Sequence, residues 1–308
     1  MRRALPVISL VALGLAVCAT SALAAEEQPT AQRAIPADNL AYPVLVQVPL
    51  AGNPKMSAQG TGFYLNLPKH TYLITARHNV FKPGTDTLLG PRARLTSYGD
   101  RPGDQIDLSK RMNVEVDLAA MQAADQLAHE TGLDALGIPI AIHTSNELTK
   151  LAKNVSRGGS DAGLVGVGWR NTKRFDEILI GNDVFIFGYP TAIGLSKIPQ
   201  LDYSRPLIRK GIVAGLNEKK RTIILDLAIY GGNSGGPVLE VHQTGPFSIN
   251  YRVIGLVTDF IPTEGVTQAT RSARNPDDVD NSGYSVAVPM EVVFEMLTRH
   301  GVVTKIGR

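Results

Sequence analysis

Short runs of apolar residues, rich in Val, Ile and aromatic side chains, alternate along the chain with turns rich in Gly, Pro and Asn. This pattern favours β-barrels or a β-sandwich over alternating β-α units. It predicts nine strands: Tyr42–Val48, Gly62–Leu67, Tyr72–Thr75, Val184–Gly188, Gly211–Leu216, Thr222–Ile229, Pro237–Val241, Arg252–Val257 and Tyr284–Val288.

Two segments have helical spacing instead. Apolar residues recur every three or four positions over Leu118–His129, and again over the terminal segment that opens at Pro289. Such stripes normally face a core, so we assign neither a binding role. The polar, Gly-rich segment 150–171 is predicted to connect two halves of the protein.

The first residues are predicted to form a signal peptide rather than part of the fold. Arg2 and Arg3 precede the apolar run Leu5–Ala19, and Ala22-Leu23-Ala24 matches a small-x-small cleavage site. This is the pattern of a bacterial secretory signal peptide over residues 1–24, and the run is short for a membrane span. The alternative is an uncleaved N-terminal anchor. We therefore expect a periplasmic or secreted protein, with a polar linker over residues 25–40.

Composition limits the possible partners and cross-links. The formal net charge is +3, and two of these charges belong to Arg2 and Arg3, so no nucleic-acid or anionic-membrane partner is expected. Cys18 is the only cysteine, so the cleaved chain would have no disulfides in an oxidising compartment. A hydrophobic content of 44% is ample for a stabilising core.

The strongest chemical signal is the string Gly232–Val238, which reads Gly-Asn-Ser-Gly-Gly-Pro-Val. A nucleophilic serine needs a tight turn and nearby backbone N–H groups for the oxyanion, and glycines permit both. The alternative is a glycine-rich turn with an ordinary serine, which the longer string with Pro237 and a following strand disfavours.

The same residues fit the nucleophile elbow of an α/β-hydrolase, and hence an esterase. In that fold the catalytic histidine follows the serine in the chain, and the serine begins a helix. Here only His242 and His300 follow Ser234, and Pro237–Val241 is predicted to be a strand. The elbow interpretation is therefore disfavoured.

His78 is the candidate general base. It lies in Leu73–Val80, where a buried strand ends in a short turn, and a histidine fixed there can reach across a cleft. A single histidine in this place is more often structural. Together with the serine string and a predicted hairpin at Gly60–Phe63, a functional role is favoured.

These motifs resemble the chymotrypsin-like serine peptidases, among them the bacterial trypsin-like and Deg-type periplasmic proteases. The resemblance implies an all-β fold of two perpendicular six-stranded antiparallel barrels with a C-terminal helix. It places a peptidase domain at 41–298, with barrels at about 41–149 and 178–290 and the helix at 289–299. The matching pieces stand in family order over about residues 42–298: Gly60–Phe63, Thr75–His78, Val184–Pro190, Gly211–Val213, Asp226, Gly232–Val238, Ile254–Val257 and Tyr284–Pro289.

The acid that orients the histidine has two candidates. Relatives carry an Asp followed by a hydrophobic-Ala-hydrophobic strand. Asp134 precedes the apolar stretch Ile138–Ile142, whereas Asp117 runs on into the helical pattern. We prefer Asp134 and keep Asp117 as the alternative, because Gly137 stands where relatives have an apolar residue.

The resemblance implies an exported serine endopeptidase that cleaves proteins or peptides through His78, Asp134 and Ser234 and an acyl-enzyme. The backbone N–H groups of Gly232 and Ser234 would form the oxyanion hole, and neither a cofactor nor a metal is required. The alternative is a catalytically inactive trypsin-fold protein with a binding or chaperone-like role.

Family position also gives substrate-binding residues: Ala228 at the base of the pocket, Val257 and the segment 281–283 on its walls, and Thr258 beside them. None of these side chains is charged, so we expect a neutral, small or apolar substrate side chain, with Phe260 narrowing the entrance.

Two further expectations concern activation and additional modules. Self-activating relatives have an Asp just before the serine, whereas this chain has Asn233. We therefore expect removal of the signal peptide alone to give a competent site, with no stable membrane association afterwards. Deg-type relatives often append peptide-binding modules; the chain ends shortly after its terminal helix, so we expect none here.

Overall fold

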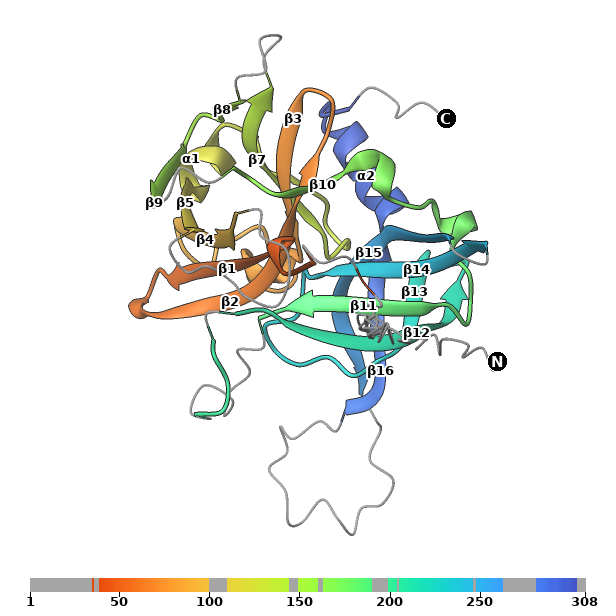
Figure 1. The fold of residues 1–308 in the computed structure, drawn as a ribbon. Coiled ribbons are helices and arrows are strands. Elements are labelled where there is room, and N and C mark those ends of the chain that lie inside the picture. The colour runs from red at the N-terminus through yellow and green to blue at the C-terminus, as the bar shows by residue number, and fades with distance from the viewer. Residues whose placement is uncertain are drawn as a thin grey trace, which may run out of the picture. The chain divides into compact units, whose positions relative to one another are not determined.

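The computed structural model describes residue 35 and residues 39–99, 110–143, 149–159, 163–189, 199–203, 205–245, 248–262 and 281–303. The predicted signal peptide and most of the predicted linker lie outside these ranges. The described chain is mostly β-strand. Its two β-structures follow one another in sequence and lie side by side, with a helix close to the C-terminal end (Figure 1).

The N-terminal half is a ten-stranded sheet in which the main path of paired strands is β6-β7-β3-β2-β1-β4-β5-β9. Strand β8 pairs with β7, and β10 pairs in parallel with β2. The strands are β1 (Pro43–Leu50), β2 (Asn53–Asn66), β3 (His70–Thr75), β4 (Arg92–Tyr98), β5 (Arg111–Asp117), β6 (Ala128–His129), β7 (Leu136–His143), β8 (Thr149–Leu151), β9 (Val155–Gly159) and β10 (Gly166–Gly168).

The C-terminal half is a closed antiparallel barrel of six strands in the order β11-β12-β13-β16-β15-β14. The predicted fold, an all-β double barrel with a C-terminal helix, is thus confirmed: the C-terminal half is a closed barrel, and the ten-stranded N-terminal sheet forms a half-barrel. The barrel strands are β11 (Asp183–Gly188), β12 (Leu207–Asn217), β13 (Thr222–Asp226), β14 (Pro237–Gly245), β15 (Ser248–Pro262) and β16 (Asn281–Pro289).

The helices are short and lie outside the sheets. The terminal helix α2 starts directly after Pro289, close to its predicted start. The predicted helix over 118–129 is too long, because Asp125 has a left-handed φ of 52° and residues 128–129 pair with β7 as β6. The helices are α1 (Leu118–Ala123) and α2 (Met290–Arg299), with 3-10 turns at Asn39–Ala41, Arg77–Asn79, Trp169–Asn171 and Phe175–Glu177.

Two other local expectations need correction. Residues 60–63 lie inside the long strand β2 and do not form a hairpin turn. Segment 150–171, predicted to be only a connection, contains β9 and β10, and these strands pair with β5 and β2. Polar, Gly-rich composition therefore did not exclude edge strands here.

Side chains alternate between the two faces of each strand. A strand therefore contributes both to the core of its own half and to a second apolar cluster that the two halves share. In β2, Tyr64 packs into the core of the N-terminal sheet, whereas its neighbours Phe63 and Leu65 face a second cluster. In β11, Phe187 joins that same second cluster, while Ile186 packs inside the barrel. Successive strand residues point to opposite faces, so one apolar run can serve two cores.

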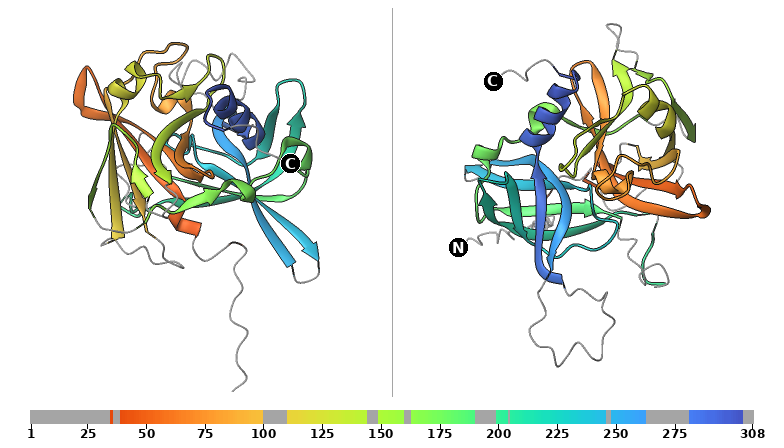
Figure 2. Two further views of the ribbon diagram at one scale, coloured as in Figure 1. Left: turned by 90° about the horizontal axis from the view of Figure 1, so that it is seen from above. Right: turned by 180° about the vertical axis from the view of Figure 1, so that it is seen from behind.

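Helix α2 completes this shared core. The helix lies beside strands of both halves (Figures 1 and 2). Its buried residues Val293 and Leu297 belong to the shared cluster. A Cβ at Gly137 of β7 would lie 2.8 Å from Leu297 Cδ2. The glycine therefore makes room for the helix, which explains why this position departs from the family pattern.

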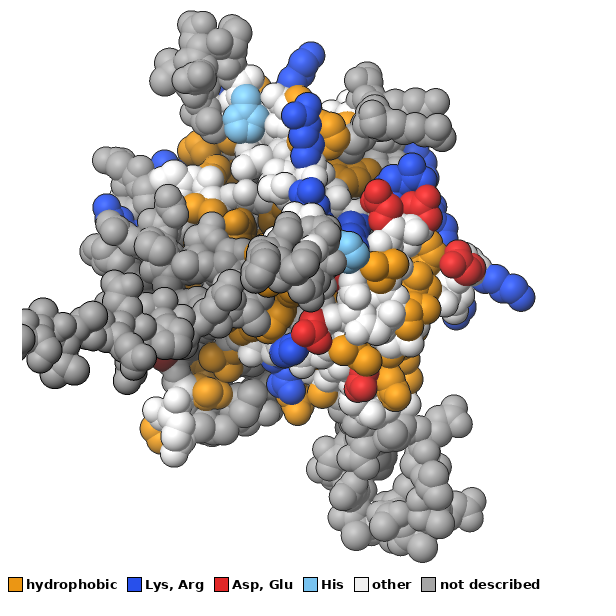
Figure 3. Space-filling model, turned by 45° about the vertical axis from the view of Figure 1, so that its right-hand side comes forward, with side chains coloured by type: hydrophobic (Ala, Val, Ile, Leu, Met, Phe, Trp, Pro, Cys, Tyr) orange, Lys and Arg blue, Asp and Glu red, His pale blue; other side chains and the backbone are white. Residues whose placement is uncertain are grey.

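The surface shows no large block of one charge on the face in Figure 3, where acidic and basic side chains lie next to each other. Ion pairs from Arg221, just before β13, to Glu291 and Glu295 of α2 are an example of such pairing. Within the described ranges, no helix has the length and apolar character that a membrane crossing requires.

Candidate active site

His78 and Asp134 meet because their strands are neighbours. His78 lies in the 3-10 turn after β3, Asp134 lies just before β7, and Thr75 pairs with Leu136 where the two strands adjoin. The His78 Nδ1 is 2.7 Å from Asp134 Oδ2, and the His78 backbone N–H donates to Asp134 Oδ1 at 3.0 Å. One carboxylate therefore holds both the ring and the backbone of the histidine.

The alternative acid, Asp117, has a different structural role. It is the N-cap of α1, and its Oδ1 accepts a hydrogen bond from the Ala120 backbone N–H at 2.9 Å. This use is typical of an Asp before a helix. The structure thus brings Asp134, and not Asp117, to the histidine.

The surroundings of His78 make its ring more basic. Burial acts to lower the pKa of His78, but the hydrogen bond that its ring donates to Asp134 and the negative charges of Asp134 and Asp259 outweigh it and raise that pKa above its ordinary value. The side chain is still 40% exposed, so it remains accessible from the cavity described below. Such a histidine suits general-base chemistry.

Arg77 anchors the turn that carries His78. Its guanidinium donates to the Thr85 carbonyl at 2.6 Å and pairs with Asp86 at 2.5 Å, and it stacks over the Phe81 ring at 4.6 Å. The side chain is buried at the base of the turn. The residues flanking the histidine are therefore fixed by contacts that do not involve its ring.

Ser234 lies on a turn whose backbone requires glycine. Gly232 and Gly235 have φ values of 93° and 88°, in the left-handed region that other residues rarely adopt. A Cβ at Gly235 would also lie 2.0 Å from the Thr61 carbonyl oxygen. The Gly235 N–H donates to the Val257 carbonyl at 2.6 Å, which ties the turn to β15.

The Ser234 hydroxyl donates to the Thr258 carbonyl at 3.1 Å rather than to His78. Even so, Ser234, His78 and Asp134 line one cavity of about 420 Å³. Within the described part of the chain, the backbone N–H groups of Gly232 and Ser234 have no acceptor, so both remain available for a ligand oxygen. The site thus combines a hydroxyl, an oriented imidazole and two unused donors.

Thr61 of β2 fastens the serine turn to the N-terminal half. Its hydroxyl donates to the Gly232 carbonyl at 2.6 Å and accepts from the Tyr189 N–H at 3.0 Å. Its backbone N–H donates to the Ser234 carbonyl at 2.9 Å, and its own carbonyl accepts from the Thr75 hydroxyl at 2.7 Å. Because Thr61 is fully buried, these bonds are shielded from water.

Asn79, the residue after His78, makes the second link between the halves. Its Nδ2 donates to the Ser234 carbonyl at 2.8 Å and lies 3.0 Å from the Thr75 hydroxyl. Gly60 makes space for this amide, since a Cβ there would lie 2.2 Å from it. We call Thr61 and Asn79 the clasp. Sequence analysis missed both roles, although Thr61 lies in the flagged Gly60–Phe63 segment and Asn79 adjoins His78.

The predicted substrate-binding residues differ in where they lie relative to the cavity. Thr258 and Phe260 line the cavity. Val257 is fully buried in the barrel core and is not among the residues that line the cavity. Ala228 is half-buried and comes just before the lining stretch, which begins at Ile229.

The full lining of the cavity includes a charged residue that was not predicted: Asp259 contributes a carboxylate. The lining residues are His78, Pro83, Asp134, Ile229, Tyr230, Gly231, Ser234, Thr258, Asp259 and Phe260.

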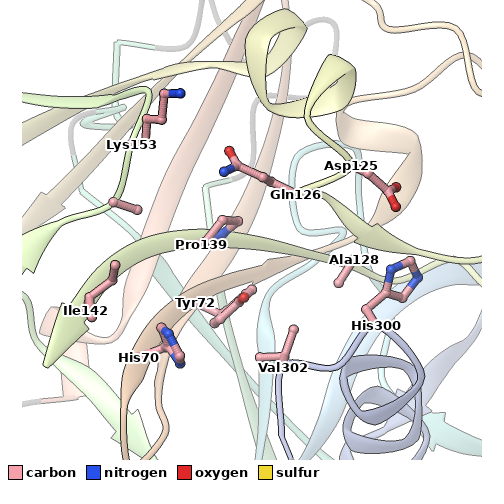
Figure 4. Close-up of a pocket in the computed structure, with 11 residues that line it drawn as sticks. His70, Tyr72, Asp125, Gln126, Ala128, Pro139, Ile142, Lys153, His300 and Val302 are labelled. Atoms are coloured by element: carbon pink, nitrogen blue, oxygen red, sulfur yellow. The ribbon is translucent and has the colours of Figure 1, made fainter.

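A second cavity of about 250 Å³ lies between the N-terminal sheet and the segment that follows α2 (Figure 4). Its polar groups come from side chains that include His70, Asp125, Lys153 and His300. Of the described residues that line it, none is a Ser, Thr or Cys. It therefore has no serine or threonine hydroxyl like that of Ser234 among its described lining residues.

Comparison with known proteins agrees with this geometry. Residues 60–245 match the trypsin-like peptidase domain family. No curated protein matches the chain. Similar solved structures include the serine endoprotease from Yersinia pestis, with 13% identity and a TM-score of 0.45, and the HtrA-type protease AlgW with a tripeptide, with 16% identity and a TM-score of 0.46.

These likenesses cover 85% of this chain but only 63% and 62% of the two solved chains, so the chain spans less than two thirds of their length. The family match covers more than half of the chain and contains both His78 and Ser234. The chain belongs to the trypsin-like peptidase domain family.

Proposed function

We propose that this protein is an exported serine endopeptidase in which Ser234 is the nucleophile, His78 the general base and Asp134 the acid that orients it. The observation that carries the proposal is the 2.7 Å contact between His78 and Asp134 at the wall of a cavity that also exposes Ser234. An imidazole held by a carboxylate beside a serine hydroxyl is the arrangement that acyl transfer requires.

In the proposed reaction, the Ser234 hydroxyl turns from the Thr258 carbonyl towards His78. Its oxygen attacks the scissile carbonyl carbon while the imidazole takes its proton, and Asp134 stabilises the resulting imidazolium. The N–H groups of Gly232 and Ser234 bind the oxyanion of the tetrahedral intermediate. His78 then protonates the leaving amine, and water releases the acyl group by the same steps.

A second candidate is an inactive trypsin-fold protein that binds polypeptides. The observation that favours it is the Ser234 hydroxyl, which donates to Thr258 rather than to the imidazole. Catalytic hydrogen bonds in unliganded enzymes are often formed only in the complex with substrate, so we prefer the peptidase.

Fluorophosphonate labelling separates the two candidates. An active peptidase takes one label, on Ser234, and Ser234→Ala takes none at that site. Hydrolysis of an unfolded protein should fall by at least about 10⁴-fold in Ser234→Ala. A wild-type protein that folds normally but neither takes the label nor cleaves any substrate would contradict the peptidase and leave the binding role.

Export is part of the same proposal and rests on the N-terminal sequence. Arg2, Arg3, the apolar run and Ala22-Leu23-Ala24 have the order of a cleavable signal. Expression of the full chain in a bacterium should give a periplasmic or secreted protein that begins at Ala25. A protein recovered only in the cytoplasm with Arg2 and Arg3 retained would contradict export.

A further inference from the structure

The cavity at Ser234 has an uneven distribution of charge. Its lining carries the carboxylates of Asp134 and Asp259 and the imidazole of His78, and no Lys or Arg is among the described residues that line it. A cavity with acidic groups and no fixed cation attracts positively charged ligands. The two carboxylates differ, however, in the hydrogen bonds that their oxygens already accept.

Asp134 is occupied. Both of its oxygens accept from His78, one from the ring and one from the backbone N–H. Its charge is therefore used to orient the imidazole, and a substrate group that competed for it would disturb the base. This leaves Asp259 as the carboxylate that a substrate can approach.

Asp259 is exposed and forms no ion pair with a described residue. Its one hydrogen bond within the described ranges is local, from the Phe260 backbone N–H to Oδ1 at 2.8 Å. A carboxylate oxygen accepts several hydrogen bonds, so most of its acceptor capacity is free. Arg209 stacks on the Tyr230 ring at 4.7 Å but does not itself line the cavity.

Asp259 is also close to the reacting atoms. It directly follows Thr258, whose carbonyl accepts the Ser234 hydroxyl. Its negative charge is one of the causes that raise the pKa of His78. The carboxylate thus lies where a substrate side chain beside the scissile bond would pass.

The aromatic side chains of the cavity suit a long basic side chain. Phe260 and Tyr230 line it together with Asp259. Lys and Arg have aliphatic stems that pack on apolar surface while their charged ends reach a carboxylate, and their cations also interact favourably with aromatic rings. A neutral small side chain would use neither feature.

We propose that Asp259 is a specificity-determining residue, which selects protein substrates with a Lys or Arg side chain next to the scissile bond. This rests on the proposed peptidase function and replaces the neutral preference expected from the sequence. Because Asp259 is exposed, the expected preference for a basic over an isosteric neutral residue is modest, about threefold to tenfold in kcat/KM, and it shrinks as salt is added.

The test compares matched peptides that differ only in Lys against Gln or norleucine at positions flanking the cleaved bond. The wild type should prefer Lys at one of these positions. Asp259→Asn should lose that preference, so that its kcat/KM for the Lys peptide falls to that for the neutral peptides, and Asp259→Lys should prefer Glu. Asp183→Asn is the control, because Asp183 pairs with Lys210 and does not line the cavity.

Two results would overturn the proposal: no preference in the wild type, or a preference that survives in Asp259→Asn, as it would if that variant lost the same factor on every peptide. Binding to Ser234→Ala separates this proposal from the peptidase function. Ser234→Ala should bind the Lys peptide more tightly than the Gln peptide, and this difference should vanish when Asp259 is also replaced. That result would support recognition by Asp259 even if the wild type hydrolysed no peptide. Equal affinities would contradict recognition even where hydrolysis succeeds.

Discussion

The two halves of the molecule hold their reactive groups in different ways. In the N-terminal sheet, a side-chain contact between His78 and Asp134 fixes the proposed base at the ends of two paired strands. In the barrel, backbone geometry fixes the proposed nucleophile, through the left-handed Gly232 and Gly235 on either side of Ser234. The position of His78 thus depends on a neighbouring side chain, whereas the position of Ser234 depends on two residues that have none.

The clasp connects the N-terminal sheet to the turn that carries Ser234. Asn79 adjoins the base in sequence but donates to the Ser234 carbonyl, and Thr61 bonds to the serine turn at two points. We therefore expect substitutions at three places to have separate effects: at Asp134, in the turn that carries Ser234, and in the clasp.

The largest effect is expected when the base loses its partner. Asp134→Asn should lower kcat/KM by about 10⁴-fold with little change in folding, because an amide does not hold the imidazole in the required tautomer or stabilise its cation. Hydrolysis of an unfolded protein measures this. Asp117→Asn is the matched control and should be close to wild type, since Asn also caps helices well. If Asp117→Asn were inactive and Asp134→Asn active, the assignment of the acid would be wrong.

A smaller loss is expected when the nucleophile turn is strained. Gly235→Ala would have to hold a φ of 88° with its Cβ 2.0 Å from the Thr61 carbonyl. We expect kcat to fall by about 10²- to 10³-fold and the free energy of unfolding by about 2–4 kcal/mol.

Gly215→Ala is its control in the same barrel, because a Cβ there meets open space. Kinetics and denaturant titration should find that variant close to wild type. A Gly235→Ala protein with normal kcat and stability would contradict the described turn.

Breaking the clasp should reduce both stability and turnover. Asn79→Ala leaves the buried Ser234 carbonyl with one donor fewer, and we expect a loss of about 1–3 kcal/mol in the free energy of unfolding and roughly tenfold in kcat, with KM unchanged. Asn113→Ala, which breaks a contact with Thr96 away from the site, should lower stability without changing kcat. If both variants lost only stability, Asn79 would be structural rather than a positioning residue.

The smallest effect concerns pH. The base must be neutral to accept a proton, and the pKa of His78 is raised, so kcat/KM should rise with pH through a midpoint above that of an ordinary histidine. Because the charge of Asp259 contributes to this rise, Asp259→Asn should move the midpoint to lower pH. Profiles on a neutral peptide test this, and an unchanged or higher midpoint in the variant would contradict it.

Local sequence patterns predicted much of this structure. The alternating runs located every barrel strand, and the string around Ser234 predicted a turn that the φ values of Gly232 and Gly235 explain. The apolar strand after Asp134 correctly distinguished it in position from Asp117, whose following residues form a helix. These features depend on residues within a few positions of one another.

What the sequence did not predict depends on contacts between distant residues. Asn79 and Ser234 are 155 positions apart, and no local pattern pairs them. The missed strand β6 forms only because Ala128 pairs with Gly137, which ended a predicted helix early. Asp259 was overlooked because its role depends on the cavity that it lines rather than on its neighbours in sequence.

The most direct test of the account measures how fast a fluorophosphonate probe labels the purified protein and its His78→Ala variant, with the labelled residue found by peptide mapping. The account predicts one label per wild-type chain, on Ser234, and labelling at least about a thousandfold slower without the imidazole. If the variant were labelled as fast as the wild type, or if the label lay on another residue, the pairing of His78 with Ser234 would be contradicted.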